Sequence, residues 1–120
     1  MTAVQDAVRL LRQLPEIQNA YAWRIPSDKQ SATNTTDALV TDVLNTSIHG
    51  SDQTEDTFET IAVNIFLGKG SNLSLDQLTK SVVSKFEQAG WTTNQISPTT
   101  IDPDTNQFTK IFQFTERTTN

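Results

Sequence analysis

The fold of this chain is decided by residues 58–67, which read FETIAVNIFL. The apolar residues alternate between two sides, with Ile61, Val63, Ile65 and Leu67 on one and Phe58, Ala62 and Phe66 on the other. A period of two is typical of a β-strand. Because both sides carry apolar residues, we expect a central strand, or a strand whose second side meets a partner.

Two amphipathic segments predict helices at about residues 2–14 and 75–89. The apolar stripes that indicate them recur at helical spacing, with Val4, Ala7, Val8, Leu11 and Leu14 in the first and Leu75, Leu78, Val82, Phe86 and Ala89 in the second. Pro15 ends the first segment. Ser74 and Gln77 form a capping-box pattern at the start of the second, and Gly90 suits its C-terminal end.

Four further strands are predicted at residues 20–25, 38–44, 91–96 and 108–116. The order is then α-β-β-β-α-β-β, within a single domain of residues 1–120. Consecutive strands joined by turns favour an α+β fold with a mixed, mostly antiparallel sheet and both helices on one face. The polar stretches 27–36 and 45–57 are expected to be mobile loops.

The charge of the chain is negative and uneven. Its net charge is −5, which disfavours a protein that holds nucleic acid through phosphate contacts. Between Lys29 and Lys69 there is no Lys or Arg, while six acidic residues fall there, namely Asp37, Asp42, Asp52, Glu55, Asp56 and Glu59. Solvated loops are the ordinary interpretation of such a stretch. The N-terminus lacks the pattern of a signal peptide and no apolar run has transmembrane length, so no membrane partner is expected.

The sequence argues against catalysis and against a cofactor or metal site. There is no cysteine, and His49 is the only histidine. His49 lies near Ser47 and Asp52 in an expected loop, which gives no preorganised nucleophile and base. Asp52, Glu55 and Asp56 lack the ligand spacing of a calcium loop, and one histidine does not make a zinc site.

Two other patterns have ordinary structural interpretations. The run Gly68-Lys69-Gly70-Ser71 has the wrong spacing for a phosphate-binding loop, so a strand-to-helix turn explains it. Tyr21, Trp23 and Trp91 are compatible with carbohydrate binding or an interface, although one aromatic residue per strand is more often part of the core or of a sheet surface. The sequence does not decide between these interpretations.

The whole chain resembles the small tail-terminator or tail-completion proteins of long-tailed bacteriophages. It looks closest to a family of uncharacterised tail proteins from phages and prophages of Gram-positive bacteria. The resemblance is carried by the order and length of elements, which here contain residues 7–11 (AVRLL), 14–17 (LPEI), 24–26 (RIP), 39–43 (LVTDV), 61–66 (IAVNIF), 90–91 (GW), 102–104 (DPD) and 110–114 (KIFQF).

This resemblance implies a structural virion protein that is not an enzyme. Such a subunit forms a ring, usually a homohexamer, at the head-proximal end of the tail, after synthesis in the host cytoplasm. The ring stops growth of the tail tube and joins tail to head. The implied partners are other copies of the chain, the major tail-tube protein, a head-completion or connector protein, and DNA that passes through the lumen without specific binding.

Two hypotheses remain open beside one another. In the first, Asp52, Glu55, Asp56 and Glu59 line the lumen or a rim of the ring, where carboxylates repel DNA or meet basic residues of the tail tube. The alternative is a soluble ligand-binding or regulatory α+β domain, which needs a pocket with converging polar groups. A small hydrolase is the weakest hypothesis, because the sequence offers no nucleophile–base pair.

Overall fold

The computed structural model describes residues 2–29, 33–49 and 55–119 of the chain. Over this part, two helices and a six-stranded mixed sheet form one α+β domain in the order α1, β1, β2, β3, α2, β4, β5, β6. The predicted class and element order are confirmed. The one addition is β5 (Thr100–Ile101), a short strand that pairs with β6 inside the predicted link.

The helices α1 (Ala3–Arg12) and α2 (Leu75–Gln88) form where the apolar stripes predicted them. The Ser74 hydroxyl accepts a hydrogen bond from the Gln77 amide at 3.1 Å, as the capping pattern predicted. After α2, Gly90 adopts a φ of 94°, and the Trp91 amide donates to the Phe86 carbonyl at 3.0 Å. These bonds satisfy end groups that a helix otherwise leaves unpaired.

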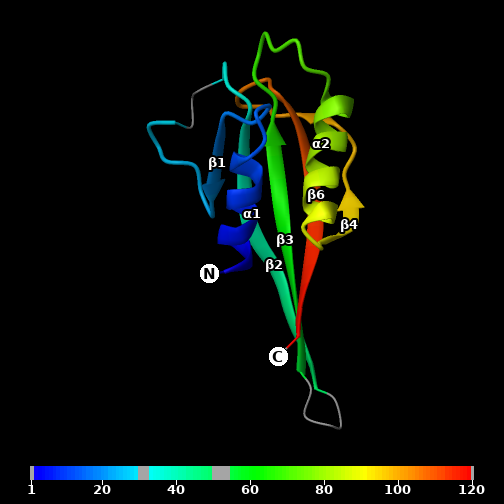
Figure 1. The fold of residues 1–120 in the computed structure, drawn as a ribbon. Coiled ribbons are helices and arrows are strands. Elements are labelled where there is room, and N and C mark those ends of the chain that lie inside the picture. The colour runs from blue at the N-terminus through cyan, green and yellow to red at the C-terminus, as the bar shows by residue number, and fades with distance from the viewer. Residues whose placement is uncertain (1, 30–32, 50–54, 120) are drawn as a thin grey trace.

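The sheet has the strand order β1-β2-β3-β6-β4, with β5 beside β6. The short strand β1 (Asn19–Ala22) runs parallel to β2 (Asp37–His49). All other pairings, among β2, β3 (Glu55–Phe66), β6 (Phe108–Thr119), β4 (Thr92–Ile96) and β5, are antiparallel. Both helices cover the same face of this sheet and leave the other face without a helix (Figure 1).

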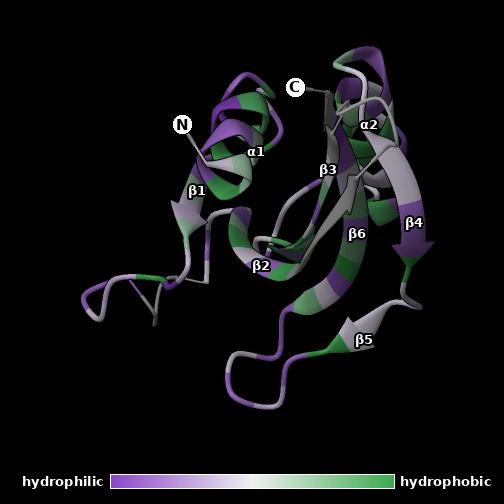
Figure 2. Ribbon diagram, turned by 90° about the horizontal axis from the view of Figure 1, so that it is seen from below, coloured by the Kyte–Doolittle hydropathy of each residue, from purple (hydrophilic) through white to green (hydrophobic). Residues whose placement is uncertain are grey.

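The core lies between the helices and the sheet (Figure 2). Val40, Val63 and Phe112 form one row of it, since the register places them side by side on three adjacent strands, and all are fully buried. Phe86 of α2 stacks on Phe114 of β6, with ring centroids 4.2 Å apart. Aromatic burial of this kind contributes a large share of the stability of a small domain.

Several boundaries differ from prediction, and one of them is the end of β6, which runs to Thr119 instead of stopping at residue 116. The expected polar loop at residues 45–57 is wrong over most of its length, because β2 continues to His49 and β3 begins at Glu55. Residues 50–54 lie outside the described part, and the mobility of both polar loops stays a prediction. Strand β1 ends at Ala22, before the predicted Ile25, because Trp23 turns the chain with a positive φ of 68°.

The extra strand length builds an arm. Strand β1 pairs with β2 only as far as Val40, and β4 pairs with β6 no nearer the C-terminus than Thr115. Beyond these points β2, β3 and β6 continue alone as a ribbon that leaves the body of the protein (Figure 1). We call residues 44–49, 55–60 and 115–119 the arm. A β-bulge between Asp42 and Leu44 marks its base, where such an insertion bends the strand.

The arm makes the molecule elongated. The chain measures 55 × 28 × 24 Å, and its radius of gyration is 15.3 Å. A compact domain of this length has a radius of gyration of about 14 Å. Six residues of strand account for roughly 20 Å of reach, which explains the difference.

Candidate functional site

Three of the four acidic residues singled out from the sequence fall on the arm. Asp52 lies outside the described residues. Glu55 is the first residue of β3, opposite His49, and Asp56 is paired with Ile48 and Thr119. Glu59 lies nearer the body, between Asn45 of β2 and Glu116 of β6. The structure therefore brings three of the four predicted residues onto one strand, but not into a closed site.

Glu59 and Glu116 form a cross-strand pair of like charge. They lie directly opposite each other on β3 and β6, a placement that destabilises a sheet. Burial raises the pKa of Glu116 above its ordinary value of 4.5, and the negative charges of Asp6 and Glu59 raise this pKa further. Asp6 comes from the first turn of α1, where its carboxylate also pairs with Arg9 at 2.8 Å.

A hollow of about 320 Å³ opens beside this pair, against the first turn of α1. Asp42 and Glu59 line it together with Trp23, whose indole Nε1 donates a hydrogen bond to Asp42 Oδ1 at 3.1 Å. We call Asp6, Asp42, Glu59 and Glu116 the acidic patch. It lies at the base of the arm on the face that the helices cover.

The acidic patch adds residues to the predicted acidic set that the sequence did not single out. Asp6 and Glu116 are far in sequence from the acidic stretch, and only the register of β3 against β6 brings Glu116 opposite Glu59. The helix dipole of α1 favours carboxylates near its N-terminus, which offsets part of their repulsion. Chemically, such a patch attracts basic side chains and repels phosphates.

The patch does not form a metal centre. Among the described residues, no three His, Asp or Glu side chains come together in a way that holds a metal ion. His49 ends β2, on the arm rather than in the expected loop. The turn at residues 68–71 binds its own chain, since the Lys69 amide donates to the Thr33 carbonyl at 2.7 Å and the Ser71 amide donates to the Gly68 carbonyl at 3.2 Å.

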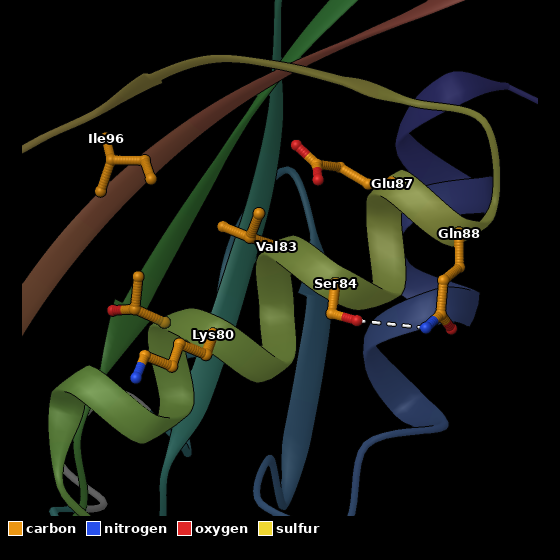
Figure 3. Close-up of a pocket in the computed structure, with 7 residues that line it drawn as sticks. Lys80, Val83, Ser84, Glu87, Gln88 and Ile96 are labelled. Atoms are coloured by element: carbon orange, nitrogen blue, oxygen red, sulfur yellow. Dashed lines mark hydrogen bonds between the residues drawn. The ribbon is translucent and has the colours of Figure 1, made fainter.

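A second hollow lies at the opposite edge of the sheet, between α2 and β4 (Figure 3). It has a volume of about 580 Å³, and Val83 and Ile96 are its apolar lining residues. Polar side chains surround them: Glu87 accepts a hydrogen bond from Thr93 of β4 at 2.9 Å, and Gln88 donates to Ser84 at 3.2 Å. The sequence stripe of α2 did not include Val83, so this groove was not predicted.

The three aromatic residues left undecided by the sequence have different roles. Trp91 is buried and packs edge-on against Phe86, with centroids 5.4 Å apart. Trp23 is 49% exposed and lies at the edge of the sheet. Tyr21 is half-buried on β1, where it pairs with Leu39 of β2. The core and surface interpretations each apply to part of the set.

Comparison with known proteins gives one family and no described activity. In the described part of the chain, neither helix is both long and apolar enough to span a membrane. No curated protein matches the sequence. One family matches residues 2–119, nearly the whole length, and the chain therefore belongs to the family described as "Protein of unknown function (DUF806)".

Proposed function

We propose that this chain is a structural subunit of a phage virion, the ring that terminates or completes the tail and joins it to the head. The observation that carries the proposal is the arm. A three-stranded ribbon that a helix covers only at its base contributes little to its own stability. When the arm packs against a neighbouring subunit, that contact supplies the stabilising packing that the arm lacks in the free chain.

The free edges of the arm support assembly. Beyond Val40, β2 has no outer neighbour among the described strands, and beyond Thr115 the same holds for the outer edge of β6. Unpaired backbone N–H and C=O groups along an edge are a template for pairing with another chain. Two different edges on one subunit suit a head-to-tail arrangement, which closes into a ring when the rotation between subunits permits.

The acidic patch and the acidic residues of the arm supply the second part of the proposal. In a ring they face either the DNA channel, where they repel phosphates, or the tail-tube and head-completion proteins, where they attract basic residues. The ring is located at the head-proximal end of the tail. The alternative, a ligand-binding domain, is favoured by one observation, a cavity at the far end of the sheet that is described below.

Charge reversal at Asp52 and Asp56 tests the function. We expect purified chain to form a discrete ring, with a mass that is a multiple of 13.4 kDa in light scattering over a concentration series. The double variant Asp52→Lys with Asp56→Lys is compared with Asp28→Lys with Asp76→Lys, which makes the same change in net charge on exposed residues away from the arm. A chain that stays monomeric at all concentrations, alone and with a tail-tube protein, contradicts the proposal.

The same variants distinguish the two roles of the acidic residues in an assembly assay with a phage that carries the gene. Short tails or free heads from the Asp52→Lys, Asp56→Lys variant indicate docking. Complete particles that fail to eject DNA indicate a channel. Normally tailed, infectious particles rule out an essential role for this segment, whatever the control variant does.

A further inference from the structure

A cavity of about 420 Å³ lies on the open face of the sheet, at the end away from the arm. Four segments that are distant in sequence line it: the chain after β1, the start of β2, the end of β3 and the turn between β5 and β6. Its volume lies within the range of ligand sites in proteins. Asp37, Leu39 and Phe66 reach it from the face opposite the helices, since their neighbours Ala38 and Ile65 are in the core.

Apolar and aromatic groups line part of this cavity. Leu39 and Phe66 come from the sheet, and the half-exposed Trp23 comes from the turn after β1. The backbone fixes Trp23 in place, because its amide donates to the Val40 carbonyl at 2.7 Å while its φ is 68°. A positive φ is uncommon for a bulky residue and persists only where the surroundings hold it.

Asp37 is a buried carboxylate in the wall of the cavity. The residue is only 3% exposed. Its Oδ1 atom accepts two hydrogen bonds, from Asn19 Nδ2 at 3.0 Å and from Thr35 Oγ1 at 2.9 Å, and both donors are neutral. Among the described residues, Oδ2 has no donor and no Lys or Arg nitrogen pairs with this carboxylate. A buried charge is costly unless a partner of opposite charge compensates it.

The other charges at the cavity are of both signs. Asp102 holds its own turn, since Oδ1 accepts from the Asp104 amide at 3.0 Å and Oδ2 accepts from Thr105 Oγ1 at 3.2 Å. Asp104 carries a further carboxylate at the rim, and Arg24 and Lys29 line the same space. None of these four residues forms an ion pair with another described residue. Burial is the largest cause that raises the pKa of Tyr21, and the negative charge of Asp37 is the second. The charge of Asp37 therefore acts on a side chain of the open face.

We propose that this cavity binds an arginine side chain presented by a partner protein. A guanidinium group donates to Asp37 Oδ2 and to the Asp104 carboxylate, while its planar face stacks on Phe66. The fork of guanidinium donors matches a carboxylate, and its weak hydration lowers the cost of entering a half-buried site, so arginine fits better than lysine. This proposal does not depend on the proposed ring. A result that contradicts the ring leaves the arginine site untouched, and a result that contradicts the arginine site leaves the ring untouched.

The test uses Trp23 as its reporter. The chain has two tryptophans, so Trp91→Phe leaves Trp23 as the sole indole and keeps an aromatic ring in the core. This protein is titrated with N-acetyl-arginine amide and, separately, with N-acetyl-citrulline amide, which has the same shape without the charge. We expect a saturable change in emission with arginine and at least tenfold weaker binding of citrulline.

Two variants identify the residues responsible. Asp37→Asn keeps an oxygen that accepts from Asn19 and Thr35 but loses the charge, and we expect at least a tenfold loss of arginine affinity; Asp76→Asn, on an exposed residue of α2, is the matched control and is expected to have no effect. Lys29→Met removes a competing cation and should tighten binding several-fold. Equal binding of arginine and citrulline, or no saturable binding of arginine, overturns the proposal without any variant of Asp37.

Discussion

The repulsion between Glu59 and Glu116 predicts that removing one of the two charges raises the free energy of unfolding. Replacing Glu116 by Gln keeps the size of the side chain and removes one of two like charges that face each other across β3 and β6. We expect the free energy of unfolding at pH 7 to rise. Cross-strand charge pairs contribute roughly 0.2–1 kcal/mol, and the partial exposure of Glu116 places the effect near the middle, at about 0.5 kcal/mol.

The pH dependence follows from the raised pKa of Glu116. The folded chain holds this proton more tightly than the unfolded chain, whose carboxyl titrates near the ordinary value of 4.5. Folding stability therefore decreases as the pH rises from about 4.5 through the raised pKa, and the penalty is complete above that pKa. Well below pH 4.5 the group is neutral in both states, so Glu116→Gln should give no gain there.

Urea unfolding at low ionic strength measures this difference. For a chain of 120 residues, a gain of about 0.5 kcal/mol corresponds to roughly 0.3 M in the urea midpoint and about 2 °C in the melting temperature. Glu59→Gln should stabilise as well, and the double variant should gain less than the sum of the two. A gain at pH 3.5 equal to that at pH 7, or additive gains, would refute the role of charge repulsion.

Three substitutions test the elements that hold the fold, each by the same urea assay. Phe86→Ala removes a fully buried ring that stacks on Phe114, and should cost about 3–5 kcal/mol. Gly68→Ala should cost about 1–3 kcal/mol, because its new methyl group would lie 2.8 Å from the Asn34 carbonyl oxygen in the backbone; no loss would mean that this contact is looser. Ser74→Ala removes the hydroxyl that caps α2 and should cost about 1 kcal/mol, and Ser74→Thr, which keeps a hydroxyl, serves as its control.

The sequence predicted those elements whose signals are local. Both helices carry an apolar stripe and a recognisable end. Ile61, Val63 and Ile65 occupy every second position of their strand, and this pattern predicted that they share a buried face. The outer parts of β2 and β3 have no such signal, since residues 45–47 and 55–57 are polar throughout. They are strands because they pair with each other as a hairpin. The outer part of β3 pairs in addition with β6, a contact between segments about sixty residues apart.

The candidate sites depended still more on distant contacts. The absence of Lys and Arg between residues 29 and 69 drew attention to the acidic stretch, but Glu116 joins it only through the register of β6. The cavity around Asp37 requires four separate segments to meet. Asp37 itself looked like one more solvated acid, and its burial follows from Asn19 and Thr35, whose roles are visible only in three dimensions.

The pH dependence of assembly distinguishes the two proposed roles of the acidic patch. If basic residues of a partner meet the patch, they lower the pKa of Glu116, so association releases protons and strengthens as the pH rises through the raised pKa. If instead the patches of neighbouring subunits gather around a channel, more negative charge raises this pKa, and association of the chain with itself takes up protons and strengthens as the pH falls. Light scattering between pH 4 and 8, on the chain alone and with a tail-tube protein, measures the sign. Glu116→Gln is the control, because it should flatten either dependence. A dependence that this variant leaves unchanged means that Glu116 is not at the interface, and the acidic patch then has neither role.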